Sequence, residues 1–138
     1  MIVLDTNVLS EAMKPSPDPA LARWMVREHS RGLFTTAVSE AEIIYGIAML
    51  PEGRRKRALE AAALGVLALF AGRILPFDSL AAREFAAIVV DRRRLGRPIN
   101  DFDAQIAAIT RARSMSLATR DTRDFTETGV QIIDPWQP

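Results

Sequence analysis

Acidic side chains stand at four well-separated places in this 138-residue chain. Asp5 ends the apolar run "IVL", Glu42 lies in "TTAVSEAEIIYG", Asp101 and Asp103 open "DFDAQIAAIT", and Asp121 follows "SLATR". Carboxylates brought together raise each other's pKa unless a cation neutralises them. Oxygen ligands without His or Cys select hard ions such as Mg²⁺ or Mn²⁺. Such an ion can activate water and stabilise the charge that develops on a phosphodiester.

The composition excludes the other common catalytic sets. The chain has no cysteine, so it can form neither a disulfide nor a thiolate site, and this suits a reducing cytoplasm. Its one histidine, His29, follows an Arg-rich segment without an evident partner and is interpreted as a surface residue. A serine triad would therefore lack its base.

Each acid also has a local structural explanation. Ser39 and Glu42 have the spacing of a capping box, in which the Glu side chain bonds the N-cap amide. Asp121 can cap a turn. Asp5 is the acid that such an explanation fits least, because it ends a strand.

The acids of "NDFD" can likewise belong to a helix start. Asn100 or Asp101 is a natural N-cap, and Asp103 would then lie in a first turn, where the helix dipole favours anions.

The elements that must position these acids follow from the hydrophobic pattern. Strands are expected at residues 2–4, 33–36, 74–77, 116–118 and 130–133. Helices are expected at residues 8–13, 19–28, 40–49, 54–71, 81–94 and 102–113. Strands separated by helical crossovers predict an α/β fold with a mostly parallel sheet of four to five strands and helices on both faces. Functional side chains gather at the carboxyl ends of such strands.

Length and charge add further bounds. The chain suits one domain, residues 1–138, and shows no secretory leader. Its most apolar stretch, residues 61–72, is too short to span a bilayer. Of its 18 basic residues only Lys14 and Lys56 are lysines. Arginine-rich runs at residues 54–57 and 91–97 can meet a nucleic-acid backbone or form solvated helix faces.

Six stretches together resemble the PIN-domain ribonucleases, and more closely the VapC/FitB toxins of bacterial toxin–antitoxin pairs. They are "MIVLDTNVLSE", "AVSEAEIIYGIAML", "LFAGRILPFD", "INDFDAQIAAIT", "LATRDTRDF" and the closing "IIDPWQP". They cover nearly the whole chain in the order typical of that family. The resemblance implies a three-layer α/β/α PIN fold and RNA hydrolysis by metal-bound water, leaving a 5′-phosphate and a 3′-hydroxyl.

The resemblance also implies which acids form the site. Asp5, Glu42, Asp103 and Asp121 would be the catalytic quartet. Asp5 and Asp103 would bind Mg²⁺, or Mn²⁺ as a substitute, and the other two would complete the site.

The resemblance extends to two polar residues and leaves three further acids open. Asn7 would support Asp5, and Thr119 would orient the attacking water. Many relatives have apolar or neutral residues at the positions of Glu40, Asp101 and Asp124. These three acids would either modify the metal site or cap helices.

The partners implied by the resemblance are RNA, a small VapB/FitA-like antitoxin that wraps the toxin, and a second copy of the chain. DNA would be met only through the antitoxin, and no membrane is involved. The helices that contain residues 61–72 and "IIYGIAML" are candidates for these contacts or fill the core.

Three other functions compete with this one. A haloacid-dehalogenase phosphatase needs a second Asp where Asn7 stands, and a late lysine. A receiver domain could use Asp78 as acceptor, but it too needs a late lysine, and Asp78 is better interpreted as an N-cap. A catalytically weak PIN domain that acts as a binding or regulatory protein is the third.

Overall fold

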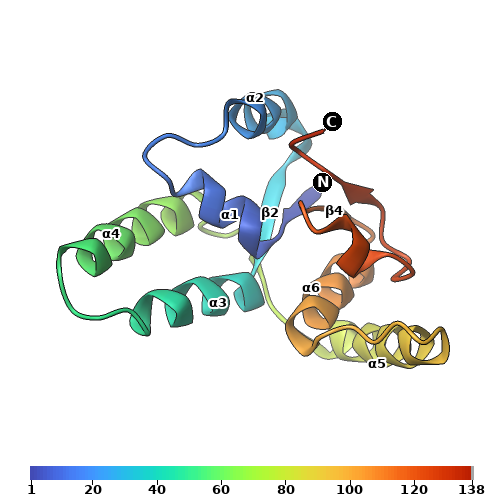
Figure 1. Ribbon diagram of the computed structural model, residues 1–138. Helices are drawn as coiled ribbons and strands as arrows, with labels where there is room; N and C mark the ends of the chain where they lie inside the picture. The colour runs from blue at the N-terminus through green and yellow to red at the C-terminus, as the bar shows by residue number, and fades with distance from the viewer. Residues whose placement is uncertain (138) are drawn as a thin grey trace.

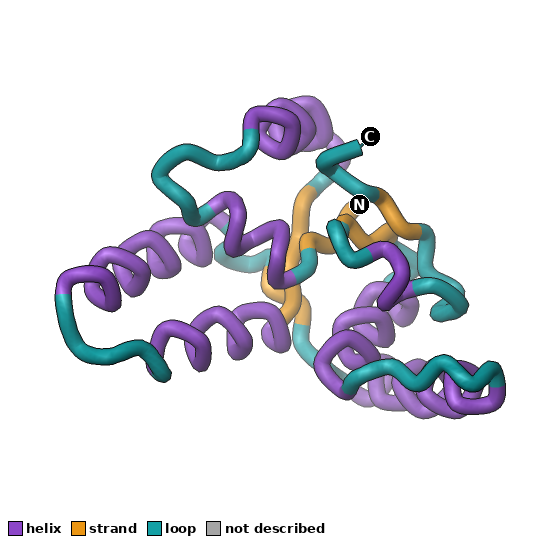
Figure 2. The backbone as a smooth tube through the Cα atoms, viewed as in Figure 1, coloured by secondary structure: helices purple, strands orange, loops and turns teal. Residues whose placement is uncertain are grey.

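Five parallel strands form the centre of the computed structural model, which describes residues 1–137 (Figures 1 and 2). Their order across the sheet is β3-β2-β1-β4-β5. The strands are β1 (Ile2–Leu4), β2 (Leu33–Thr36), β3 (Ile74–Leu75), β4 (Ser116–Ala118) and β5 (Ile132–Ile133). In register, Ile2 pairs with Leu33 on one side and with Ser116 on the other. The predicted α/β fold with a parallel sheet is confirmed.

Within the described residues, six α-helices and two short 3₁₀-helices connect the strands. The α-helices are α1 (Thr6–Ala12), α2 (Pro19–Glu28), α3 (Ala37–Ala48), α4 (Arg54–Leu69), α5 (Ser79–Arg94) and α6 (Asp101–Ala112). The 3₁₀-helices are η1 (His29–Arg31) and η2 (Thr122–Phe125). Figure 1 shows α3 and α4 side by side, as are α5 and α6. No helix of residues 1–137 combines the length and apolar character needed to cross a bilayer.

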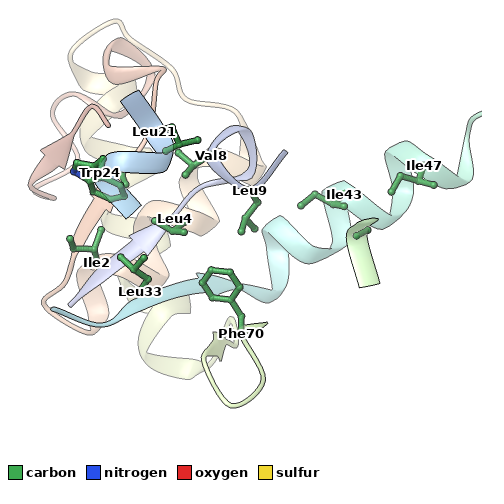
Figure 3. Close-up of a cluster of buried hydrophobic side chains, with 12 residues drawn as sticks. Ile2, Leu4, Val8, Leu9, Leu21, Trp24, Leu33, Ile43, Ile47 and Phe70 are labelled. Carbon is green, nitrogen blue, oxygen red and sulfur yellow. The ribbon is translucent and has the colours of Figure 1, made fainter. Parts of the chain in front are cut away.

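The two faces of the sheet bury separate apolar clusters, which gives the predicted three layers. Ile2 and Leu4 pack with side chains of α1 to α4, among them Trp24 of α2 (Figure 3). Val3, whose side chain points to the other face, packs with Leu117 of β4 and with side chains of α5 and α6. Strand residues alternate between faces, so three residues of β1 serve both layers.

Several predicted boundaries are wrong, and local chemistry explains most of them. Helices expected from residues 8, 40 and 81 begin earlier, because Asp5, Thr36 and Asp78 cap α1, α3 and α5 with their side chains. The strand expected to reach Phe77 ends at Leu75, since Pro76 has no N–H for a ladder.

Smaller shifts affect the other ends. The strand expected from Val130 begins at Ile132, after Gly129 with φ 75°. The helices expected over residues 54–71 and 102–113 run over 54–69 and 101–112. Strands 2–4, 33–36 and 116–118 and helix 19–28 have the predicted bounds.

Candidate active site

The four predicted acids line one cavity of about 420 Å³. They come from the end of β1, from α3, from the start of α6 and from the segment that follows β4. The full lining is Asp5, Thr6, Asn7, Ser10, Glu11, Lys14, Glu42, Asp103, Arg120, Asp121 and Trp136. Parallel strands place their carboxyl ends at one edge of the sheet, which brings these distant segments together.

Asp5 is fixed by two hydrogen bonds at the junction of β1 and α1. Its Oδ1 accepts from the backbone N–H of Asn7 at 2.8 Å, and its Oδ2 accepts from the Thr119 hydroxyl at 2.6 Å. The first bond makes Asp5 the N-cap of α1, a local structural role that the sequence indicated less for Asp5 than for the other acids. The residue is only 4% exposed.

The surroundings of Asp5 oppose its ionisation. Burial raises the pKa of Asp5 from its usual 3.8 to about 6. The hydrogen bonds from Thr119 and Asn7 lower the pKa, and the charge of Asp121 raises it further. A cation bound beside Asp5 would stabilise the charged form that burial disfavours, so this carboxylate is suited to bind one.

Asn7 and Thr119 both support the acids of the site through hydrogen bonds. The Asn7 side chain donates to Asp121 Oδ2 at 2.6 Å, so it holds Asp121, and only its backbone N–H supports Asp5. Thr119 is fully buried; its hydroxyl donates to Asp5 and accepts from the Asp121 N–H at 3.0 Å. The Thr119 hydroxyl therefore holds Asp5 and connects it to Asp121.

Glu42 is directed into the cavity by Thr6. The Thr6 hydroxyl is 2.7 Å from Glu42 Oε1. The capping-box interpretation of Glu42 is wrong, because α3 begins at Ala37 and its cap is Thr36, which accepts from the Ser39 N–H at 3.0 Å. Glu42 thus lies in the second turn, and the cap does not use it.

Asp103 lies in the first turn of α6, where the N-cap residue bonds it, and it also lines the cavity. Asn100 caps α6 as predicted: its Oδ1 accepts from the Asp103 N–H at 2.8 Å, and its Nδ2 donates to Asp103 Oδ2 at 2.7 Å. Burial is the main cause that raises the pKa of Asp103, against the Asn100 bond. The charges of Asp124, Glu42 and Asp121 raise it further, because the acids lie close together.

The three acids whose role the sequence left open lie outside the cavity lining. Glu40, Asp101 and Asp124 do not line the cavity, although the charge of Asp124 acts on Asp103.

Thr6 and Trp136 are among the lining residues that were not predicted as site residues. Thr6 directly follows Asp5, and a polar residue beside this acid could have been predicted to line the site. Trp136 belongs to the closing "PW", whose return to the cavity depends on the long-range pairing of β5 with β4.

A family model described as "PIN domain" matches residues 2–131. This chain belongs to the PIN-domain family.

Relatives of this PIN domain match over nearly their whole length. A protein named VapC ribonuclease Y4jK, from Sinorhizobium fredii, is 40% identical over 139 residues, which cover 100% of this chain and 99% of that protein. The toxin FitB of Neisseria gonorrhoeae is 38% identical over 137 residues, with 99% of each covered. A FitAcB crystal structure from Neisseria gonorrhoeae superposes with a TM-score of 0.90 at 37% identity, covering 100% of both chains. A structure of FitAB bound to an IR36 DNA fragment gives a TM-score of 0.89 at 39% identity, covering 99% of this chain and 96% of that one.

The donor set of this PIN domain fits a hard divalent cation. The acids that line the cavity offer only oxygen ligands, and burial of Asp5 and Asp103 disfavours their charged forms in the absence of a cation. Over residues 1–137, no three acidic or histidine side chains form a preassembled ligand cluster. Mg²⁺ binds commonly through one or two carboxylates and keeps several waters, so two of these acids would be enough to hold it.

Proposed function

We propose that this PIN domain is a Mg²⁺-dependent endoribonuclease that acts as the toxin of a toxin–antitoxin pair. The observation that carries the proposal is the convergence of Asp5, Glu42, Asp103 and Asp121, from four separate segments, on one cavity. The relatives named VapC ribonuclease and FitB toxin support the choice of RNA as substrate and the toxin role.

The residues take distinct roles in this proposal. Asp5 and Asp103 would hold Mg²⁺, with Mn²⁺ as a substitute, and Glu42 and Asp121 would complete the site directly or through water. The ion would supply Lewis-acid activation of water and charge stabilisation at the phosphodiester. Thr119 and Asn7 keep Asp5 and Asp121 in place, and Thr6 directs Glu42. Ligands held on strand ends and helix starts keep their geometry better than ligands on loops.

An apolar groove beside the acids supports an antitoxin as partner. A second cavity of about 310 Å³ shares Thr6, Ser10, Lys14 and Glu42 with the acidic one. Its other lining residues, mostly apolar, come from the segment after α1, from α3 and the loop after it, and from α4: Met13, Pro15, Ile43, Gly46, Ile47, Leu50 and Leu59. A peptide with apolar side chains and one basic residue would fill the groove and enter the acidic cavity.

The two helices proposed for partner contacts, α3 and α4, each have a buried apolar face and exposed apolar residues. Ile43 and Ile47 of α3 and Ala63 of α4 are buried in the core, whereas Ile44 and Leu64 are 55% and 72% exposed. The exposed faces can receive an antitoxin or a second copy of the chain, and we include a homodimer in the proposal. Contact with DNA would pass only through the antitoxin.

RNA cleavage by purified wild type and Asp103→Asn, with Mg²⁺, with Mn²⁺ and with chelator, tests the proposed activity. We expect metal-dependent cleavage in the wild type and a decrease of at least about 100-fold in Asp103→Asn. Asp101→Asn, two residues away and outside the cavity, is the matched control and should keep its activity. Equal cleavage by wild type and Asp103→Asn would contradict the assigned site.

The second candidate is a PIN domain that binds without cleaving. Absence of cleavage by both proteins, after any bound antitoxin has been removed, would favour it.

A further inference from the structure

Arg120 and Trp136 form a stacked pair in the lining of the acidic cavity. The guanidinium carbon of Arg120 lies 4.9 Å from the centre of the Trp136 ring. This distance is within the range of a cation–π contact, which is strongest with Trp. The pair joins two segments that the sequence separates, the end of β4 and the end of β5.

Trp136 is a fixed platform. Its ring is half-buried and packs against the cluster that contains Ile2 and Leu4. Its backbone N–H donates to Asp134 Oδ1 at 2.9 Å, directly after β5. The indole N–H is buried without a partner in residues 1–137, so packing holds the ring.

A hydrogen bond holds the backbone of Arg120, whereas its guanidinium forms no ion pair within residues 1–137. Its N–H donates to Asn7 Oδ1 at 3.4 Å, and the residue stands between Thr119 and Asp121. Within residues 1–137 no carboxylate forms an ion pair with Arg120, although acids share its cavity. Lys14, the other cation of the lining, pairs with Glu11 at 3.0 Å.

An acidic cavity that cuts RNA must also attract a phosphate chain. Like charges repel, so a cation of the protein next to the acids would favour the approach of the RNA strand. Stacking uses the flat face of a guanidinium and leaves its N–H groups, which lie in the plane, for a phosphate.

We propose that Arg120 binds a phosphate of the RNA strand beside the bond to be cleaved, and that Trp136 is the positioning residue that holds Arg120 for this contact. The inference rests on the proposed ribonuclease function and adds to it the residue that receives the substrate backbone.

Steady-state cleavage of a short single-stranded RNA by Arg120→Gln, Trp136→Leu and Trp136→Phe tests the inference. Arg120→Gln should raise KM about tenfold with a smaller change in kcat, since it removes binding rather than chemistry. The slope of log KM against log salt should fall by about 0.7, because one phosphate is no longer neutralised by the protein. Trp136→Leu should raise KM in the same direction while every charge is kept, and Trp136→Phe should restore most of the affinity because it keeps a π face.

Arg123→Gln is the matched control, because this exposed arginine lies three residues further on and outside the acidic cavity. It should leave KM within about twofold of the wild type. Equal KM and equal salt slope in Arg120→Gln and Arg123→Gln would overturn the inference while the ribonuclease function stands.

A binding measurement separates the role of Arg120 from the proposed activity. Fluorescence anisotropy of a labelled RNA in chelator should show about tenfold weaker binding for Arg120→Gln than for wild type, and near wild-type binding for Arg123→Gln. A wild type that binds the RNA but does not cleave it would remove the proposed activity, and the binding comparison would still decide the role of Arg120. A wild type that neither binds nor cleaves would overturn both.

Discussion

The hydroxyl of Thr119 donates to Oδ2 of Asp5 at 2.6 Å, across 114 positions of the chain. Both residues are buried, and each directly follows one of two neighbouring strands, β4 and β1. The same hydroxyl accepts from the N–H of Asp121, so one side chain connects two acids of the cavity. The geometry of the acids therefore depends on the pairing of these two strands.

Replacing Thr119 by Val removes this hydroxyl and keeps the shape of the side chain. Asp5 then has only one of its two hydrogen bonds and is less well oriented for a cation. Removal of such a supporting partner typically lowers metal affinity or activity about 10- to 100-fold. A Mg²⁺ titration of RNA cleavage measures the change, with Thr122→Val as control. Unchanged Mg²⁺ dependence in Thr119→Val would contradict the support assigned to this hydroxyl.

Asn7 determines where Asp121 lies, because its side chain donates to Asp121 Oδ2 at 2.6 Å. We expect Asn7→Ala to lower kcat about tenfold, the decrease typical of removing one polar partner. Asn7→Asp should lower it more, since a second carboxylate would repel Asp121. Ser10→Ala is the control, because it removes a polar group from the same cavity lining without removing a hydrogen bond to an acid. If both Asn7 variants matched Ser10→Ala in kcat, Asp121 would need no such support.

Strand patterns separated by helical patterns predicted the parallel sheet, and the resemblance to the PIN-domain ribonucleases indicated the four acids, which line one cavity. The sequence did not predict how each acid is held. Thr119 bonds Asp5, and Asn7 bonds Asp121, only because β1 and β4 are neighbours in the sheet. Trp136 was missed as a lining residue for the same reason, since its place follows from the pairing of β5 with β4.

Local rules also gave wrong answers where two of them competed. Ser39 and Glu42 have capping-box spacing, yet Thr36 caps α3 three residues earlier. Thr36 is the last residue of β2, so the helix begins directly after it and Ser39 lies inside the helix. Spacing alone cannot choose between two hydroxyl residues that both fit a cap.

Ser114 lies in the left-handed region, with φ 54°, at the end of α6. Its N–H donates to the Arg111 carbonyl at 3.0 Å, and the Met115 N–H donates to the Thr110 carbonyl at 3.1 Å. This pattern is a Schellman motif, whose left-handed position favours glycine. Ser114→Gly should raise the free energy of unfolding by about 0.5–1 kcal/mol, measured by urea titration, whereas Ser114→Ala should not. A lower stability of Ser114→Gly than of Ser114→Ala would refute this.

Arg92 is buried and uses its guanidinium to hold the segment that follows Asp121. It donates to the carbonyls of Asp124 at 2.9 Å and Thr126 at 2.6 Å, and to that of Arg97 at 2.6 Å. Arg92→Leu leaves these carbonyls unpaired and should lower the free energy of unfolding by about 2–4 kcal/mol. Arg93→Leu, at an exposed neighbouring position, should change it by less than about 0.5 kcal/mol. Chemical unfolding of the two variants gives the comparison, and equal decreases would contradict the role of Arg92.

The raised pKa of Asp5 predicts how the metal-free protein responds to pH. Burial raises this pKa from 3.8 to about 6, so the folded protein binds a proton more tightly than the unfolded chain does. Between about pH 4 and pH 6 the free energy of unfolding should therefore fall as the pH rises. Two pKa units correspond to about 3 kcal/mol, which is the upper limit of the effect.

Asp5→Asn isolates this contribution, because Asn has nearly the same shape and no charge. In chelator the variant should be more stable than the wild type at pH 7 and should match it more closely near pH 4. Mg²⁺ should stabilise the wild type at pH 7 and have little effect on the variant, since ligand binding stabilises only the form that binds. Urea unfolding of both proteins across this pH range, with and without Mg²⁺, measures all three differences. A wild type that is more stable than Asp5→Asn at pH 7 in chelator would show that ionised Asp5 contributes to the fold without a metal.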